Sequence, residues 1–139
     1  MNKKVSRKLA ALLRDAGYTN IPLKVYDAED ENDNTLYPYG EVFSGDNELY
    51  APTIADAVMW VWNTYKVWIV VWSDTNLDLP DWRDKAKWFY VLNCDLLRCW
   101  LRDYDSSIDN SLNTYNTIEE AYEAGIEYVF KNKETCLTN

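Results

Sequence analysis

The stretch Met59–Trp72, MWVWNTYKVWIVVW, holds four of the seven tryptophans of a chain of 139 residues. A helix that spans a membrane needs about 20 predominantly apolar residues. This stretch has fourteen, and the polar residues Asn63, Thr64 and Lys66 interrupt its middle. It therefore predicts two elements joined at a polar break, and no membrane segment.

The residues before the break follow the pattern of a helix. Thr53 stands where its hydroxyl can cap the first turn of a helix. Asp56 stands at the third helical position, where its carboxylate can accept a hydrogen bond from the N–H of the capping residue. Apolar side chains then recur at helical spacing, at Ile54, Ala57, Val58, Val61 and Tyr65. From Val67 the pattern changes to VWIVVW, which is β-branched, aromatic and apolar on both faces. We predict a helix at 53–65 and a strand at 66–73 in the centre of its sheet.

The N-terminal third of the chain shows the same two patterns. An apolar stripe at helical spacing, closed by Gly17, predicts a helix at 3–16. Leu23 and Val25 indicate a strand, and the aromatic run Tyr37–Phe43 indicates another. An acidic polar loop separates the two.

The C-terminal half continues in the same way. The run KWFYVL at 87–92 predicts a strand. Residues 96–103 suit either a returning strand or a short helix capped by Asp95, and both remain open. The sequence TIEE repeats the capping pattern and opens a helix predicted at 117–131.

The predicted order of elements is α-β-β-α-β-β-α. Short connections between consecutive strands favour antiparallel pairing, and helices with one apolar stripe must cover a sheet face. We predict an α+β fold in which an antiparallel sheet of about four strands is covered by three helices. Length alone fits a single domain over residues 1–139.

Charge and composition exclude several classes of function. The chain has 23 acidic and 14 basic residues, a net charge of −9, which repels a phosphate backbone. It contains no histidine, the commonest general base and metal ligand. No catalytic, cofactor or metal motif rises above background. We therefore expect a protein that is no enzyme, carries no cofactor and does not bind nucleic acid.

The cysteines and the first residues bear on localisation. Cys94, Cys99 and Cys136 are odd in number and form no C-x-x-C arrangement, which favours small apolar fillers in a reducing compartment. The start MNKKVSRKLAALLRDAG is basic, but its apolar run Leu9–Leu13 is only five residues long and no cleavage site follows. We expect a cytoplasmic protein.

One pattern resembles a calcium loop. Asp30, Asn32, Asn34 and Glu41 fall at positions 1, 3, 5 and 12 of such a loop. Position 6 needs a glycine for the sharp turn, and here it is Thr35. A solvated turn between strands is the better interpretation, so we expect no metal site.

The tryptophans carry the strongest signal in the sequence. Burying an indole removes about 150–250 Å² from water, so most of them are expected in the core. However, Trp60 lies off the stripe of its predicted helix, and a strand at 66–73 turns Trp68 away from Ile69. An aromatic surface left exposed would suit a partner protein or a sugar. Its candidate residues are Trp60, Trp68, Trp72, Trp88, Tyr90 and Trp100, the last three only if their strands neighbour 66–73.

Three blocks of sequence point to a family. They are SRKLAALLRDAGYTNIP at 6–22, VMWVWNTYKVWIVV at 58–71 and NTIEEAYEAGIEYVFKN at 116–132, about a third of the chain. Together they resemble small uncharacterised proteins encoded by prophages and other mobile elements of gut bacteria. Such proteins have no established activity, so the resemblance implies no role for any single residue.

Two functions of different class follow. The first is a non-enzymatic interaction or accessory protein of phage or mobile-element origin, which binds an unknown protein or associates with itself. One version of it presents phosphate-like charge through the carboxylates of Glu119, Glu120, Glu123, Glu127, Asp27, Glu29, Asp30 and Asp33. Ordinary solvated faces are the alternative for these carboxylates. The second function is a small-ligand or carbohydrate-binding module that uses exposed tryptophans.

Overall fold

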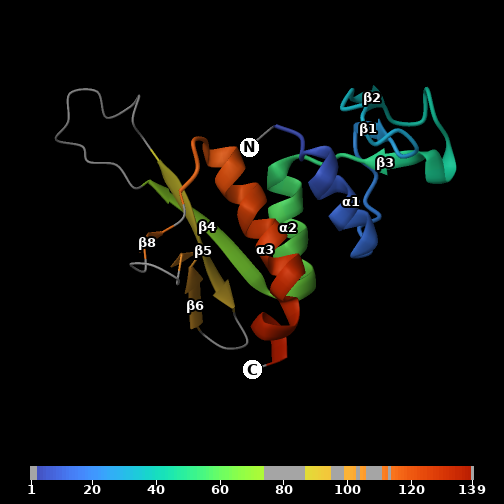
Figure 1. Ribbon diagram of the computed structural model, residues 1–139. Helices are drawn as coiled ribbons and strands as arrows, with labels where there is room; N and C mark the ends of the chain where they lie inside the picture. Colours follow the sequence, from blue (N-terminus) through green and yellow to red (C-terminus); the bar gives the residue numbers. More distant parts are fainter. Residues whose placement is uncertain are drawn as a thin grey trace. The chain divides into compact units, whose positions relative to one another are not determined.

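A computed structural model describes most of the chain (Figure 1). The described residues are 3–73, 87–94, 99–102, 104–105, 111–112 and 114–138, with side chains described for 3–73, 87–93 and 114–132. The chain divides into two units, Met1–Trp60 and Val61–Asn139, and each is considered by itself. Pairing among the three cysteines falls outside the described side chains. The single domain over 1–139 stays a prediction.

The first unit contains helix α1 (Arg7–Asp15), which starts four residues later than predicted. Ser6 is the reason, because its hydroxyl accepts a hydrogen bond from the Leu9 N–H at 3.3 Å and caps the helix. The residues before it are extended, and the Val5 N–H donates to the Pro52 carbonyl at 2.9 Å. The apolar stripe in the sequence therefore begins before the first residue of the helix.

The end of α1 follows the prediction. Gly17 has a φ of +98°, the left-handed conformation that favours glycine. Its N–H donates to the Arg14 carbonyl at 3.0 Å, and the Tyr18 N–H donates to the Leu13 carbonyl at 2.9 Å. These two bonds form a Schellman motif, which satisfies carbonyls at the end of the helix.

Three short strands form the sheet of the first unit: β1 (Lys24–Asp27), β2 (Tyr37–Pro38) and β3 (Glu48–Tyr50), in the order β2-β1-β3 with antiparallel pairing. The strand predicted over 37–43 stops at Pro38, which has no N–H to donate to a ladder. Gly40 then turns the chain with a φ of +73°. β3 was not predicted, because three residues are too few to show an alternating pattern.

Helix α2 (Ile54–Tyr65) and strand β4 (Val67–Ser73) confirm the helix and strand predicted from the tryptophan-rich stretch. The Thr53 hydroxyl accepts a hydrogen bond from the Asp56 N–H at 3.1 Å, as the capping pattern indicated. The predicted polar break is therefore a change from helix to strand. The boundary between the two units falls inside α2.

A single residue, Lys66, makes the transition from α2 to β4. Its φ of 58° is left-handed, which for a residue other than glycine costs about 1 kcal/mol. Its N–H still donates to the Trp62 carbonyl at 2.9 Å and completes the last turn of α2. Its ammonium lies 5.4 Å from the centroid of the Trp62 ring, a cation–π contact worth about 0.5–1 kcal/mol. This contact offsets much of the strain.

The second unit contains an antiparallel sheet in the order β4-β5-β6, where β5 is Trp88–Cys94 and β6 is Cys99–Arg102. β6 confirms the returning strand over the short helix. β7 (Tyr104–Asp105) and β8 (Ser111–Leu112) form a separate antiparallel pair. In the sheet that the described residues form, β4 lies at the edge, so its predicted central position is wrong.

Helix α3 (Ile118–Thr138) follows the last strand. The Thr117 hydroxyl accepts from the Glu120 N–H at 3.1 Å, and the Glu120 carboxylate accepts from the Asn116 N–H at 3.2 Å. The helix start predicted at Thr117 is therefore confirmed. Asn132 leaves helical geometry with φ −125° and ψ 18°, close to the predicted end, but the chain then continues helical to Thr138.

α3 packs along β4 and β5 in the second unit (Figure 1). The contact is close at Gly125, because a Cβ placed there would lie 2.9 Å from Ile69 Cγ2 and 3.2 Å from Tyr90 Cγ. The glycine thus lets the α3 backbone approach the sheet. The side chains buried in this unit include Val67, Ile69, Tyr90, Leu92, Ala121, Ile126 and Val129.

The predicted α+β class, the three helices and the antiparallel pairing are confirmed for the described residues. The sheet of about four strands is matched only roughly, because the strands fall into three separate sheets of three, three and two strands. Hydrophobic patterns identify strands, but they do not state which strands pair. The sequence therefore could not predict how the strands group into sheets.

Gly125→Ala tests the close approach of α3 to the sheet. Alanine in a helix is normally favoured over glycine by about 1 kcal/mol. Here the added methyl meets Ile69 and Tyr90, so we expect the free energy of unfolding to fall by about 1–2 kcal/mol. Urea denaturation measures it, with Ala124→Gly on the half-buried neighbouring position as the control for propensity. An increase in stability for Gly125→Ala would contradict the packing.

Candidate functional site

The two faces of β4 differ in exposure. Val67 and Ile69 are 0% and 2% exposed, and Ile69 lies on the face that α3 covers. Trp68 and Trp72 point to the other face and remain 37% and 57% exposed. Two large indoles on one side of one strand form the exposed aromatic surface that the sequence indicated.

The register of β4 and β5 decides which other aromatic residues belong to this face. Directly opposed residues in an antiparallel pair share a face. Tyr90 pairs with Val71 and Trp88 pairs with Ser73, which puts both on the side of Ile69. The expectation that Trp88 and Tyr90 extend the patch of Trp68 and Trp72 is therefore wrong, although β5 does neighbour β4. Tyr90 is 2% exposed and Trp88 is half-buried.

Phe89 and Val91 share the open face instead, because they pair with Trp72 and Val70. Phe89 is half-buried and Val91 is buried. The backbone of Trp100 pairs with that of Asn93, and its side chain lies outside the described part. The part of the surface that the structure describes is thus carried by Trp68 and Trp72.

Trp68 is held by a contact with the preceding helix. Its ring packs edge-on against the ring of Trp62, with centroids 5.6 Å apart and planes at 83°. Lys66 lies over the same Trp62 ring. Such edge-to-face pairs add about 0.5–1.5 kcal/mol beyond burial. The exposed indole of Trp68 is therefore fixed in orientation, which lowers the entropy that a partner must remove on binding.

The hydrogen bonds of Trp88 show in which direction the backbone N–H and C=O groups of β4 point. Trp88 and Tyr115 exchange two backbone hydrogen bonds, of 2.9 and 2.8 Å. Trp88 also pairs with Ser73 of β4, on its opposite side. Because the N–H and C=O of one residue in a strand point to the same side, those of Trp88 point away from β4. The pair of Trp88 and Ser73 is therefore a non-hydrogen-bonded pair.

Hydrogen-bonded and non-hydrogen-bonded pairs then alternate along the whole ladder between β4 and β5, because its register is unbroken. Trp68, Val70 and Trp72 direct their backbone groups to β5. Val67, Ile69 and Val71 direct theirs to the outer edge of β4. Val67 and Ile69 are 0% and 2% exposed as whole residues, so this edge is covered where they lie. The exposed part of β4 is therefore the face of Trp68 and Trp72.

Trp60 belongs to the first unit. Its ring packs edge-on against Tyr18, with centroids 5.4 Å apart and planes at 68°, and it is half-buried. Burial, followed by the charge of Asp56, raises the pKa of Tyr18. The contact suits an aromatic core residue of the first unit.

The acidic residues predicted on α3 have local roles. The Glu120 carboxylate caps the helix start, and the Glu127 carboxylate lies 2.7 Å from the ammonium of Lys131. Glu119 and Glu123 are half-buried. These contacts match ordinary helix stabilisation between neighbouring turns. They favour the solvated-face interpretation of α3 over phosphate mimicry.

The acidic loop of the first unit brings three carboxylates together. Oxygens of Asp27, Asp30 and Asp33 lie within 4.8 Å of one another, a different set from the predicted calcium register. Each carboxylate accepts a backbone N–H two residues ahead, at 2.9–3.1 Å. These bonds form the turns that shape the loop. The cluster is therefore accounted for by loop structure, and we assign it no metal.

Asp33 is also joined to the strand that follows. The Tyr37 hydroxyl donates to its second oxygen at 2.7 Å. Hydrogen bonds from Thr35 and Tyr37 lower the pKa of the Asp33 carboxyl. The bond to Asp33 raises the pKa of Tyr37, and burial adds to that rise. The pair holds the end of the acidic loop against β2.

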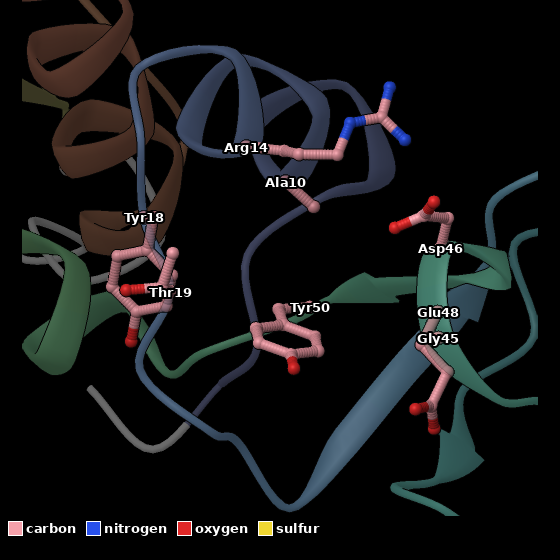
Figure 2. Close-up of a pocket in the computed structure, with 8 residues that line it drawn as sticks. All are labelled: Ala10, Arg14, Tyr18, Thr19, Gly45, Asp46, Glu48 and Tyr50. Carbon is pink, nitrogen blue, oxygen red and sulfur yellow. The ribbon is translucent and has the colours of Figure 1, made fainter.

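A pocket of about 440 Å³ lies in the first unit (Figure 2). Its wall comes from α1, from the segment after it, from the short helix η1 (Gly45–Asn47) and from β3. The lining residues are Ala10, Arg14, Tyr18, Thr19, Gly45, Asp46, Glu48 and Tyr50. Figure 2 shows the Arg14 guanidinium and the Asp46 carboxylate on different sides of the opening.

The chemistry of this pocket is mixed. Glu48 is 9% exposed, and its carboxylate accepts the Gly40 N–H at 2.6 Å. Burial and the hydroxyl of Tyr39 raise the pKa of Tyr50, so the phenol stays protonated at neutral pH. The lining holds one guanidinium, that of Arg14, and two carboxylates, those of Asp46 and Glu48. We assign the pocket no ligand.

Comparison with known proteins adds no family. The chain gave no match to a protein-family model, to a curated protein or to a solved structure. Among the described helices, none is long and apolar enough to cross a membrane, as the sequence predicted. The site must therefore be argued from its own geometry.

Sequence reasoning missed the most exposed apolar residues. Ile21 and Leu23 are 67% and 79% exposed, although apolar alternation placed Leu23 in a strand. It also could not tell which face of β4 is covered, because a strand that is apolar on both faces carries no sign of it.

Asp33→Asn tests the link between the loop and β2. The hydrogen bond to the Asp33 carboxylate is the main cause of the raised pKa of Tyr37, and the charge of Asp33 adds to it. An amide accepts this bond more weakly and carries no charge, so we expect the pKa of Tyr37 to fall toward its ordinary value of 10.0. In the unchanged chain, the Asp33 contribution to stability is lost as pH falls through its lowered pKa. The Tyr37 contribution is lost as pH rises through its raised pKa. NMR titration of the Tyr37 ring measures the shift.

Asp30→Asn is the matched control, because Asp30 does not contact Tyr37. It should leave the Tyr37 pKa where it is in the unchanged chain. An equal pKa of Tyr37 in the Asp33→Asn chain would show that the hydrogen bond is not formed in solution.

Proposed function

We propose that the chain is a non-enzymatic interaction protein that binds another polypeptide through the exposed face of β4. The observation that carries this proposal is the exposure of Trp68 and Trp72, 37% and 57%, on the face that α3 does not cover. Exposed aromatic side chains gathered on one face are typical of a surface that contacts another protein.

The composition of β4 supports the proposal. Its seven residues, VWIVVWS, carry no charge, and the core of a protein–protein interface is depleted of charge and enriched in tryptophan. A cytoplasmic setting and an origin in a prophage or mobile element belong to the proposal as well.

A small-ligand or carbohydrate module is the second candidate, and the exposure of Trp72 favours it. Sugars stack on exposed indoles, so a ligand panel that quenches tryptophan emission would support this function. The two candidates therefore differ in the kind of molecule that changes the emission of Trp68 and Trp72, which is a sugar or another small ligand here and a second polypeptide in the first candidate.

A capture experiment tests the function directly. Tagged chain is mixed with an extract of the source cells and with an untagged second copy. We expect a protein whose recovery is lost with Trp68→Lys/Trp72→Lys, since the two lysines remove the exposed indoles and add charge, which the core of an interface disfavours. Glu119→Lys/Glu120→Lys is the control and should leave recovery unchanged. Equal recovery of every protein by the tryptophan variant, second copy included, contradicts the proposal.

A further inference from the structure

We infer that one face of the β2-β1-β3 sheet binds a basic segment of another polypeptide, in which lysine or arginine accompanies apolar residues. This face carries Leu23, Tyr37, Tyr39 and Tyr50 and is called the tyrosine face below. It belongs to the first unit, and the inference does not depend on the contact proposed at β4. Three features lead to it: the register of the sheet, the exposure of its side chains and the charge around them.

The register of the sheet puts these side chains on one face. Val25 of β1 pairs with Tyr37 of β2 and with Tyr50 of β3, and opposed residues share a face. Leu23 and Tyr39 lie two residues further along their chains, and the Tyr39 N–H donates to the Leu23 carbonyl at 3.1 Å. The rings of Tyr39 and Tyr50 pack edge-on with centroids 5.8 Å apart. Val25 is buried, so the larger side chains around it form the surface of this face.

The two faces of this sheet differ in exposure. Leu23 is 79% exposed and Tyr39 is 36% exposed on the tyrosine face. On the opposite face, Tyr26 and Leu49 are buried. The Tyr26 hydroxyl donates to the Val5 carbonyl at 2.6 Å, which ties that face to the N-terminal segment. One face is therefore core, and the other is exposed apolar and aromatic surface of the kind that marks an interaction site.

The charge around the tyrosine face is negative. Residues 21–50 carry eight carboxylates and one basic residue, Lys24. Lys24 precedes Val25 in β1 and therefore points to the opposite face. Two arginines of α1 come near, but Arg7 donates to two backbone carbonyls at the end of β1 and Arg14 lines the pocket. The excess of carboxylates attracts a basic partner and repels an acidic one.

Carboxylates lie at one end of the tyrosine face. Asp27 ends β1 four residues after Leu23, on the same face. Its carboxylate oxygens lie within 4.8 Å of those of Asp30 and Asp33, and the Tyr37 hydroxyl donates to Asp33 at 2.7 Å. These contacts hold the carboxylates in place and leave their charge and further acceptor sites. A lysine or arginine over the Tyr37 ring would combine a cation–π contact with an ion pair to Asp33.

The order of the side chains defines the pattern that a partner must carry. The apolar end at Leu23 and the acidic end at Asp27 are separated by four residues of strand, about 13 Å. An extended segment matches both ends when apolar residues come first on one of its faces and basic residues follow on the same face. The peptide LSLSKSK has this pattern, because every second residue points to the same side.

NMR titration of the full chain with LSLSKSK tests the inference. We expect the signals of Leu23, Tyr37 and Tyr39 to shift and the dissociation constant to rise as salt screens the charges. Two matched peptides separate the contributions. LSLSESE reverses the charge and SSSSKSK removes the apolar residues, and each should bind at least about tenfold more weakly than LSLSKSK.

A pair of variants locates the site. Leu23→Lys places a positive charge on the tyrosine face, and because Leu23 is 79% exposed the fold should be retained. It should raise the dissociation constant of LSLSKSK at least about tenfold. Met59→Lys is the matched control, since it makes the same change of net charge at a 46% exposed position of α2. It should leave the dissociation constant within about twofold.

Each other outcome overturns the inference. Equal weakening by Leu23→Lys and Met59→Lys would show attraction by net charge alone, and equal binding of LSLSESE would remove the need for a basic partner. Loss of LSLSKSK binding in Trp68→Lys/Trp72→Lys, with Leu23→Lys unaffected, would place the basic segment on β4 and leave the proposed function standing. Binding at the tyrosine face by a chain that captures nothing through β4 would support this inference and contradict that function.

Discussion

The alternation of β4 is the constraint on which the second unit depends. A strand apolar on both faces must find cover for each, and α3 covers only the face of Val67 and Ile69. Gly125 makes that cover close, because any larger residue would hold the helix away from Ile69 and Tyr90. On the opposite face Trp62 packs against Trp68 and Val91 is buried, while Trp72 remains 57% exposed.

The function proposed for the chain follows from the same asymmetry. Most of the titratable groups with special contacts, such as Asp33, Glu48 and Glu120, serve turns, caps and loop anchors. They are local structural contacts. The indoles of Trp68 and Trp72 instead remain exposed apolar surface, which suits them to a second polypeptide.

The elements could be predicted where a local signal was strong, and only there. Capping by Thr53 and Thr117, the glycine after α1 and the change of period at Lys66 each act within a few residues, so the sequence placed those boundaries well. The start of α1 was missed, because Ser6 caps the helix inside an apolar stripe that begins at Val5. Short β3 gave no pattern to recognise.

The sequence by itself determined the α+β class, the three helices and the position of the tryptophan-rich strand, because caps and hydrophobic periods are properties of neighbouring residues. Tertiary structure decided which strands pair and which face of β4 carries the exposed tryptophans. It moved Trp88 and Tyr90 to the covered face and left Trp68 and Trp72 on the open one. Register is set between segments distant in sequence, and one residue of shift exchanges the two faces.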